Sequence, residues 1–193
     1  SQLECWLTSD LSNGKVWINW NNHGNKSASI QINANNNRTD GPWFYQADPG
    51  QSGKDYWRVV LWGGGYYDLE LRGPAQFMRR FRGYLNAWAV NGQPEPDIKL
   101  LTQGAGQPVA ITFTNPGSKA VTLNVVDRIG QGSTVKWAIT LAGKETRTIA
   151  IPTTQDWYDL GITLVGESYF YQSLVGHVEG RDGVSKPSLL RWS

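Results

Sequence analysis

The chain repeats itself, and this internal repeat constrains its fold more than any other feature. The segment VWINWNNHG at residues 16–24 aligns with VAITFTNPG at residues 109–117, so that Val16 falls on Val109 at an offset of 93 residues (109 minus 16). A match at a fixed offset marks a duplicated structural unit. We therefore expect two copies of one small module.

The alignment also predicts the domain boundaries. Near residues 67–69 the offset falls to 91, where Tyr-Asp-Leu aligns with a second Tyr-Asp-Leu at 158–160, and it then returns to 93. Between the copies, NGQPEPD contains two prolines, which oppose helix and central strand alike. The expected units are a first module at 1–90, a linker at 91–97, a second module at 98–180 and a polar tail at 181–193.

Within each copy, apolar and polar residues alternate, as in strands with one face on a core. Val16, Ile18 and Trp20 show the pattern in the first copy, and Val109 and Ile111 begin it in the second. The strands expected in the first copy are 3–8, 15–20, 27–34, 42–47, 54–62, 66–72 and 76–85. Seven short strands in fewer than about 100 residues predict an all-β fold of two tandem immunoglobulin-like β-sandwiches.

Composition and motifs argue against several classes of function. The formal net charge of +2, with no basic run, argues against nucleic acid as a partner. Cys5 is the sole cysteine, and His23 and His177 lie far apart, so we expect no metal and no cofactor. The nucleophile-elbow, phosphate-loop and dinucleotide motifs are absent. These observations predict a chain without a catalytic site of its own.

Targeting signals are also missing from the sequence. No apolar run is long enough for a helix that crosses a membrane. The first residues, SQLECWLTSD, lack the charged and apolar regions of a signal peptide. We therefore expect any export signal to lie outside these residues or to have been removed.

Asp68 and Glu70 raise the question of a carboxylate pair. Two acids about 5–9 Å apart catalyse glycoside hydrolysis in many enzymes, and these two share one face of the strand expected at 66–72. That face lies opposite an apolar row, and the second copy has Asp159 followed by Gly161 at the matching positions. A solvated face, with each aspartate outside the core or in a hairpin hydrogen bond, is the stronger interpretation.

Four arginines lie in and after that strand, and they are candidate contacts for a phosphate group or a protein partner: Arg72, Arg79, Arg80 and Arg82. Guanidinium groups bind phosphate through paired hydrogen bonds. The alternative is a basic sheet face, or a basic edge that guards against strand pairing. The matching residues of the second copy are Val165, Gln172, Ser173 and Val175. The fold itself therefore does not require the arginines.

The segment DGPWFYQADPG at 40–50 holds three adjacent aromatic residues. Its alignment with the second copy predicts a strand, in which Trp43 and Tyr45 lie opposite Phe44. One side of this strand must face the core. A structural role for these aromatic residues is the stronger interpretation. The alternative is that Trp43 and Tyr45 form an exposed aromatic ledge, because such rings suit sites with one wet side.

Two segments carry a resemblance to a known family. GGYYDLELRGPAQFMRRFRG and DWYDLGITLVGESYFYQSLVGHVEG each contain a Tyr-Asp-Leu run, a turn, an aromatic residue and a closing Arg-Gly or Val-Gly. They resemble the paired C-terminal repeats of bacterial secreted phosphocholine-preferring phospholipases C, the haemolytic and non-haemolytic enzymes. NNRTDGPWFYQADPGQSGKDYW and VWINWNNHG are also similar to the first of these repeats. The resemblance covers essentially the whole chain.

This resemblance implies an accessory role. In the family, a large phosphoesterase region precedes the repeats and carries the catalytic residues, none of which can be transferred to this chain. The resemblance implies a parent enzyme, exported and therefore secreted or periplasmic, that cleaves phosphatidylcholine or sphingomyelin. The expected partners are the catalytic region of the same polypeptide and a phospholipid membrane surface.

A second interpretation stays open. Ten tryptophans also suit a carbohydrate-binding or adhesion module of a secreted protein. That class predicts a coplanar row of exposed Trp or Tyr rings on one face.

Overall fold

The computed structural model describes residues 2–85, 93–129 and 134–179, so residues 91–92 of the predicted linker and the whole predicted tail lie outside the described residues. The first repeat contains β1 (Leu3–Asp10), a 3-10 turn (Leu11–Asn13), β2 (Lys15–Asn22), β3 (Ala28–Ala34), β4 (Trp43–Ala47), β5 (Ser52–Trp57), α1 (Val59–Gly63), β6 (Tyr66–Arg72) and β7 (Met78–Tyr84). The second contains β8 (Asp97–Leu101), β9 (Val109–Thr114), β10 (Val121–Asp127), β11 (Val135–Leu141), β12 (Thr146–Ile151), β13 (Trp157–Leu164) and β14 (Glu167–His177).

Each repeat is a β-sandwich of a three-stranded and a four-stranded layer. The layers of the first repeat have the strand orders β1-β2-β5 and β4-β3-β6-β7, and those of the second are β8-β9-β12 and β11-β10-β13-β14. The predicted all-β fold, with seven strands in each repeat among the described residues, is confirmed. The fourth strand of each repeat lies beside the third, whereas in a constant-type immunoglobulin domain it joins the first two.

The alternating residues fill two separate cores. Val16, Ile18 and Trp20 lie in the core of the first sandwich, and Val109 and Ile111 lie in that of the second. Burial of one such aliphatic side chain is worth about 1.5–3 kcal/mol. The period of two therefore supplies much of the driving force that pairs the layers.

The strand predicted at 54–62 is wrong in its second half. β5 ends at Trp57, and α1 follows at Val59–Gly63. The helix ends because Gly64 takes the left-handed conformation at φ 62°, and its N–H group bonds to the last turn. Only Val59 of this helix is buried.

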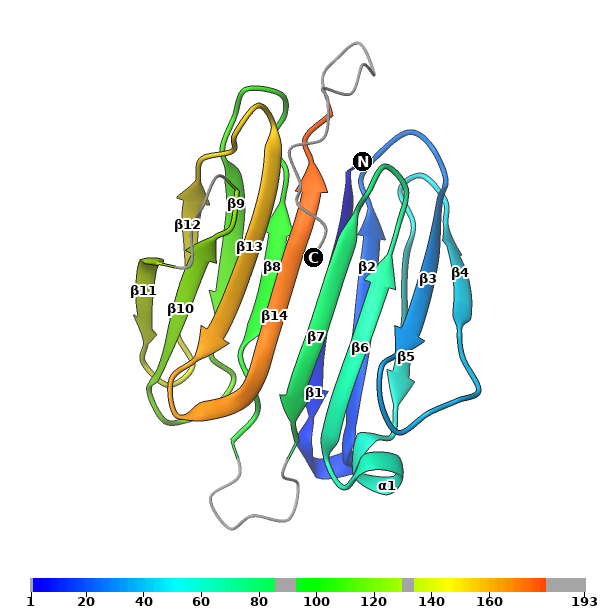
Figure 1. The fold of residues 1–193 in the computed structure, drawn as a ribbon, viewed down its shortest axis with the longest axis vertical. Coiled ribbons are helices and arrows are strands. Elements are labelled where there is room, and N and C mark those ends of the chain that lie inside the picture. Colours follow the sequence, from blue (N-terminus) through cyan, green and yellow to red (C-terminus); the bar gives the residue numbers. More distant parts are fainter. Residues whose placement is uncertain (1, 86–92, 130–133, 180–193) are drawn as a thin grey trace.

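The two four-stranded layers join edge to edge into one eight-stranded sheet. β7 pairs antiparallel with β14, at the centre of Figure 1. In this ladder Arg80 pairs with Ser173, and these positions are 93 residues apart (173 minus 80), so they are equivalent in the two repeats. A contact between equivalent positions is isologous, as in a two-fold symmetric dimer. A pseudo-two-fold axis therefore relates the repeats and passes through this pair.

The same axis relates the three-stranded layers, which lie behind the large sheet in Figure 1 and meet where β1 lies against β8. The Lys99 ammonium group lies 4.2 Å from the centroid of the Trp6 ring. Positions 6 and 99 are again 93 residues apart (99 minus 6). The repeats thus meet in both layers through equivalent strands, and together they form one body.

In each repeat, the tyrosine of the Tyr-Asp-Leu motif pairs with a glycine on the next strand. Tyr67 pairs with Gly83, and Tyr158 pairs with Gly176. A Cβ atom on either glycine would collide with the phenol oxygen of the paired tyrosine. Each tyrosine therefore needs a glycine opposite it, which explains why both copies contain the two elements.

A buried carboxyl group anchors the segment before β8 to the first repeat. Glu95 accepts a hydrogen bond from the Tyr67 hydroxyl at 2.5 Å and another from the Tyr84 backbone N–H at 2.9 Å. Burial raises the pKa of Glu95 to about 8, although both hydrogen bonds act to lower it. This end of the predicted linker is therefore part of the packed structure.

The free energy of unfolding is expected to fall as the pH rises toward 8. The pKa of Glu95 is raised from 4.5 to about 8 in the folded chain, so the folded state keeps a proton that the unfolded state has released. The stabilisation is complete below the unfolded pKa and is lost as the pH passes through the folded pKa. Denaturant titrations of the chain at pH 5 to 9 measure the slope.

The Glu95→Gln variant is expected to flatten this slope. Burial also raises the pKa of Asp97, to about 6, so the slope of the variant and that of the original chain should be compared above pH 6. Glu70→Gln, on the surface beside Arg72, is the matched control. A Glu95→Gln chain with the original slope would contradict this role.

Candidate functional site

Three of the four arginines predicted as contacts, Arg72, Arg80 and Arg82, lie on the outward side of the four central strands, β6, β7, β14 and β13. We call this surface the central face. Its polar members are Asp68, Arg80, Arg82, Tyr169, Tyr171, Ser173 and Asp159, together with Arg128, which follows β10. The face belongs to both repeats, because the β7–β14 pairing runs through its middle.

Asp68 is bound by a guanidinium group. Arg80 donates to both of its carboxylate oxygens, at 3.0 and 2.7 Å, and the Asn35 side-chain amide adds a third bond at 3.1 Å. The hydrogen bond to Asp68 raises the pKa of Arg80 further above its ordinary value. Asp68 is buried beneath these partners, so it has the hairpin role that the sequence predicts and is unavailable to a carboxylate pair with Glu70.

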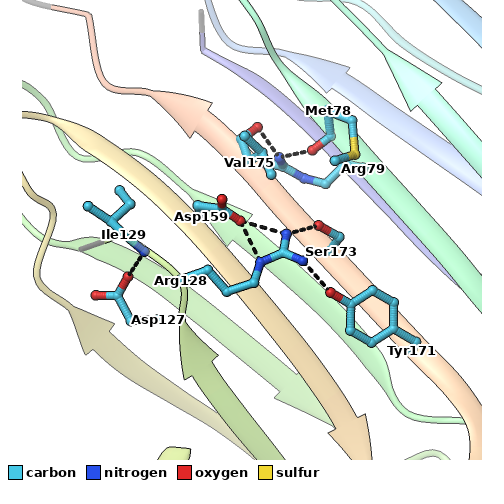
Figure 2. A network of polar contacts seen from close by, with 9 residues as sticks. All are labelled: Met78, Arg79, Asp127, Arg128, Ile129, Asp159, Tyr171, Ser173 and Val175. Carbon is cyan, nitrogen blue, oxygen red and sulfur yellow. Dashed lines mark hydrogen bonds and ion pairs between the residues drawn. The ribbon is translucent and has the colours of Figure 1, made fainter. Parts of the chain in front are cut away.

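Asp159 has the matching role in the second repeat, and Figure 2 shows its network. Arg128 donates to Asp159 from two nitrogens, at 2.8 and 2.6 Å. The same guanidinium group bonds to the Ser173 hydroxyl at 2.6 Å and to the Tyr171 hydroxyl at 2.5 Å. Arg128 therefore ties β13 and β14 to the loop after β10.

The two repeats supply the guanidinium group that binds this aspartate from different sequence positions. Arg80 and Ser173 are equivalent positions, and so are Asn35 and Arg128. The equivalence holds in space, because the backbone N–H groups of Asn35 and Arg128 bond to the carbonyl groups of Asp68 and Asp159, each at 2.8 Å.

The pseudo-two-fold axis explains the exchange. Positions 80 and 173 face each other across β7 and β14. Arginine at both would set two like charges directly opposite, which destabilises a strand pair. With arginine at 80 and at 128, each aspartate keeps one guanidinium group and the repulsion is avoided.

Arg79 does not lie on the surface at all. Its guanidinium group is fully buried and donates to the carbonyl oxygens of Met78 and Val175 at 2.9 and 3.1 Å (Figure 2), and to the Tyr158 hydroxyl at 2.9 Å. It also lies 4.0 Å from the centroid of the Phe77 ring. A buried group cannot reach an external phosphate. Arg79 instead joins the two repeats from the inside.

Arg72 and Arg82 are the remaining candidates. Arg72 pairs with Glu70 at 2.8 Å on the surface. Arg82 donates to the Tyr169 carbonyl at 3.0 Å, and its guanidinium carbon lies 5.1 and 5.4 Å from the ring centroids of Tyr169 and Tyr171. Within the part of the chain that the structure describes, Arg82 has no carboxylate partner. A phosphate or partner contact by these two side chains stays a prediction.

The alternative of a basic edge that prevents strand pairing is wrong. β7 is an inner strand, paired with β6 on one side and β14 on the other. Arg79 and Arg82 bond across the second of these pairings. The arginines therefore stabilise a strand pairing where the sequence suggested that they oppose one.

Trp43 and Tyr45 do not form an exposed ledge. Both pack against the first core, and the Tyr45 hydroxyl donates to the Asp55 carboxylate at 2.5 Å. Phe44, which lies between them, points outward and is 71% exposed. The alternation was predicted correctly, but the side that faces the core is the side of the two larger rings.

An exposed apolar surface lies instead at α1. Leu61 and Trp62 are 68% and 56% exposed. The Tyr66 ring lines a shallow pocket with Trp62. Its centroid lies 4.4 Å from the ring centroid of Tyr84 and 5.1 Å from that of Tyr169. We call these five residues the α1 patch. It crosses from the first repeat to the second, at the lower end of the molecule in Figure 1.

The shallow pocket lies beside the patch and is lined by residues of the first repeat. The Arg38 side chain borders it and lies 5.2 Å from the ring centroids of both Trp43 and Trp62. Its guanidinium group is held by Asp40 through two hydrogen bonds, at 2.7 and 2.5 Å. One face of the Trp43 ring and one face of the Trp62 ring are therefore already occupied by a cation.

The described residues offer few groups suited to metal binding or nucleophilic chemistry. They contain no group of three or more His, Cys, Asp or Glu side chains that could hold a metal ion. Burial raises the pKa of the Cys5 thiol to about 12, and the nucleophilic form of cysteine is the thiolate. None of the described helices has the length and apolar character needed to span a bilayer.

Together, the fold and the central face define a tandem β-sandwich module whose polar centre holds two repeats in one body. The family described as bacterial phospholipase C, C-terminal domain matches the chain twice, at residues 3–84 and 96–177. The chain belongs to this family and contains two copies of its domain. The resemblance found in the sequence is thereby confirmed.

The chain is also similar to the non-hemolytic phospholipase C of Pseudomonas aeruginosa, with 28% identity over 130 residues. This match covers 65% of the chain and 18% of the relative, so the chain spans about a fifth of that protein's length. Among solved structures, a red sea bream transglutaminase aligns over 93% of the chain and 32% of its own, at 12% identity and a TM-score of 0.34. A likeness this weak carries no argument.

Sequence reasoning missed Arg128 and the α1 patch. The offset of 93 contained the signal for Arg128. It aligns Arg80 of the first copy with an uncharged serine of the second, and it aligns an uncharged asparagine, Asn35, with Arg128. The helix was missed because VVLW reads as the apolar end of a strand.

The exchange of guanidinium groups can be tested in the first repeat. Arg80→Ser is expected to lower the free energy of unfolding by about 2–3 kcal/mol, because the buried Asp68 carboxylate loses its cation. Adding Asn35→Arg copies the arrangement of the second repeat and should recover most of this loss. Denaturant titration measures both changes.

Arg72→Ser is the control for this experiment. It removes an exposed ion pair and should cost about 1 kcal/mol or less. If Asn35→Arg recovers nothing in the Arg80→Ser chain, the two arrangements are not equivalent.

Proposed function

We propose that the chain is the C-terminal accessory region of an exported phospholipase C, secreted or periplasmic, that hydrolyses phosphatidylcholine or sphingomyelin. The observation that carries this proposal is the double match to the family of bacterial phospholipase C C-terminal domains. The 18% share of the relative leaves most of that protein outside the matched region. In this proposal the catalytic phosphoesterase region lies in that remainder.

The accessory region docks on the catalytic region through the α1 patch. Leu61, Trp62 and Tyr66 form an apolar exposed surface at one end of the sandwich pair. Exposed apolar groups that gather in one place are typical of interaction sites. The patch includes Tyr169 of the second repeat, so a partner seated there contacts both repeats at once.

The chain itself takes no part in bond cleavage. Its aspartates on the central face are held by Arg80 and Arg128, and its thiol is buried. Docking serves to hold the catalytic region in a fixed orientation and to aid its engagement with a lipid surface. The chain alone is therefore expected to release no phosphocholine from either lipid.

The alternative of a carbohydrate-binding or adhesion module fits the surface less well. The rings that lie side by side on the described sheet faces are not coplanar: the planes of Trp17 and Tyr56 are tilted by 56°, and the Tyr66 ring is tilted by 31° to Tyr84 and by 88° to Tyr169. Lys15 and Lys54 lie over the Trp17 ring, at 5.1 and 4.7 Å from its centroid. A sugar needs an open ring face on which to stack, and these faces are covered.

Docking predicts that the catalytic region covers α1. Backbone amides of Val59–Gly63 are expected to exchange hydrogen at least about tenfold more slowly in the full-length parent than in this chain alone, because a docked surface opens less often. Hydrogen–deuterium exchange measured by mass spectrometry compares the two proteins.

A variant of the parent sharpens this test. Leu61→Ser with Trp62→Ser should remove the extra protection and lower turnover of phosphatidylcholine vesicles. The control is Phe44→Ser, which changes a ring that is equally exposed but lies on β4, away from the patch. Equal exchange at α1 in the parent and in the isolated chain would exclude docking through this surface.

A further inference from the structure

The outward side of the three-stranded layer of the first repeat carries rings and lysines. Trp6 lies on β1, Trp17 on β2 and Tyr56 on β5. Three ammonium groups lie against these rings, those of Lys15, Lys54 and Lys99. We call these six residues the lysine–aromatic face. Lys99 belongs to β8, so the face reaches across the junction into the second repeat.

Each ring of the lysine–aromatic face has a cation over it. Lys15 lies 4.3 Å from the centroid of Tyr56 and 5.1 Å from that of Trp17, whose second cation is Lys54 at 4.7 Å. Lys99 lies 4.2 Å from Trp6. Cation–aromatic contacts of this kind hold a long side chain close to the surface while its charge stays in water.

These charges are only partly neutralised by their neighbours. Among the residues that the structure describes, Lys15, Lys54 and Lys99 form no ion pair. Of the nearby carboxylates, Asp10 accepts hydrogen bonds from Asn13 at 3.0 and 3.1 Å, and Glu4 contacts Asn21 and His23. Asp97, on the same strand as Lys99, attracts the Lys99 ammonium group without forming an ion pair with it. The face therefore presents several free ammonium groups beside exposed or half-buried rings.

The second repeat shows that the fold does not need this surface. Its β9 and β12 form the same ladder as β2 and β5. The equivalent outward pairs are Trp17–Tyr56 and Asn19–Lys54 in the first repeat, and Ala110–Ala150 and Thr112–Thr148 in the second. Small and hydroxylated side chains meet the structural requirement there. The rings and lysines of the first repeat thus have a purpose other than folding.

We propose that the lysine–aromatic face binds the surface of a phospholipid bilayer. Lipid phosphate oxygens accept hydrogen bonds from Lys15, Lys54 and Lys99, and the Trp6, Trp17 and Tyr56 rings lie at the level of the headgroups. Trp and Tyr prefer this boundary because one end of the ring system is apolar and the other polar. Lysines near an anionic bilayer add electrostatic attraction.

This inference rests on the proposed function, because a phospholipase C acts on a bilayer and its accessory region is placed near one. It assigns a different surface from the α1 patch. The lysine–aromatic face is on the outward side of the three-stranded layer, whereas Tyr66, Tyr84 and Tyr169 of the α1 patch lie on strands of the eight-stranded sheet. A bilayer and a catalytic region can therefore bind at the same time.

The test is co-sedimentation of the 193-residue chain with vesicles. Vesicles of phosphatidylcholine mixed with phosphatidylglycerol are expected to bind the chain at low salt, and phosphatidylcholine alone should bind it less tightly. Each lysine near an anionic surface changes affinity by about fivefold, so Lys15→Gln with Lys54→Gln should weaken binding by roughly 25-fold. High salt should remove most of this difference.

Two further variants separate charge from rings and from position. Trp17→Ala with Tyr56→Ala copies the Ala110–Ala150 pair that the second repeat tolerates, and it should weaken binding to both kinds of vesicle. Lys26→Gln with Lys119→Gln removes the same charge from exposed lysines outside the face and should leave binding within about twofold of the original. Circular dichroism confirms that each variant is folded.

Three outcomes would overturn the inference. One is vesicle binding that the two pairs of lysine substitutions reduce equally. Another is binding that millimolar inorganic phosphate displaces, which would indicate a site for a single anion. The last is no vesicle binding together with retention on an insoluble polysaccharide. Hydrogen exchange at α1 reports docking separately, so vesicle binding without protection of α1 would exclude the docking proposal alone.

Discussion

The antiparallel pairing of β7 with β14 is the interaction on which the rest of the structure depends. Each repeat alone would end in an exposed edge strand, and such edges invite pairing with other chains. The pairing satisfies both edges at once and makes one eight-stranded sheet. It also sets Arg80 against Ser173 on the pseudo-two-fold axis and gives buried Arg79 its acceptor on Val175. A module of under about 100 residues is marginal by itself, so this shared surface stabilises both copies.

The symmetry of this pairing explains where the two copies differ. Near the axis, equivalent residues become neighbours, and a side chain suitable in one copy can be unsuitable beside itself. Arg80 and Ser173 differ for this reason, and the guanidinium group of the second repeat moves to Arg128. Away from the axis the copies are free to diverge. Trp17 and its equivalent Ala110 occupy the same site in the fold, but only the first presents a ring for contact.

Much of the fold was predictable because it follows from periodicity and repetition. The row of Val16, Ile18 and Trp20 identified a core face, and the repeated Tyr-Asp-Leu motif identified the same hairpin in both copies. The site was less predictable. Alternation put Arg79 on the same side as Phe77 and Phe81, but an arginine is seldom fully buried without an acidic partner. Two of its acceptors, the Val175 carbonyl and the Tyr158 hydroxyl, come from the other repeat, 96 and 79 residues away in the sequence.

The sequence by itself determined that this chain is a duplicated β-sandwich, because strand period, turn residues and the internal repeat can be read from the order of the residues alone. The motifs of the two copies carried the resemblance to the C-terminal domains of bacterial phospholipases C. Only the tertiary structure decided how the copies join and which arginines reach the surface. Strand pairing between β7 and β14 is a relation between distant segments, and whether a side chain is buried depends on what is packed against it. The same pairing buries Arg79 as a link between the repeats and gives Arg82 its acceptor on Tyr169. Arg72 forms an exposed ion pair with Glu70, Arg80 forms an ion pair with the buried Asp68, and Arg82 has no carboxylate partner among the described residues.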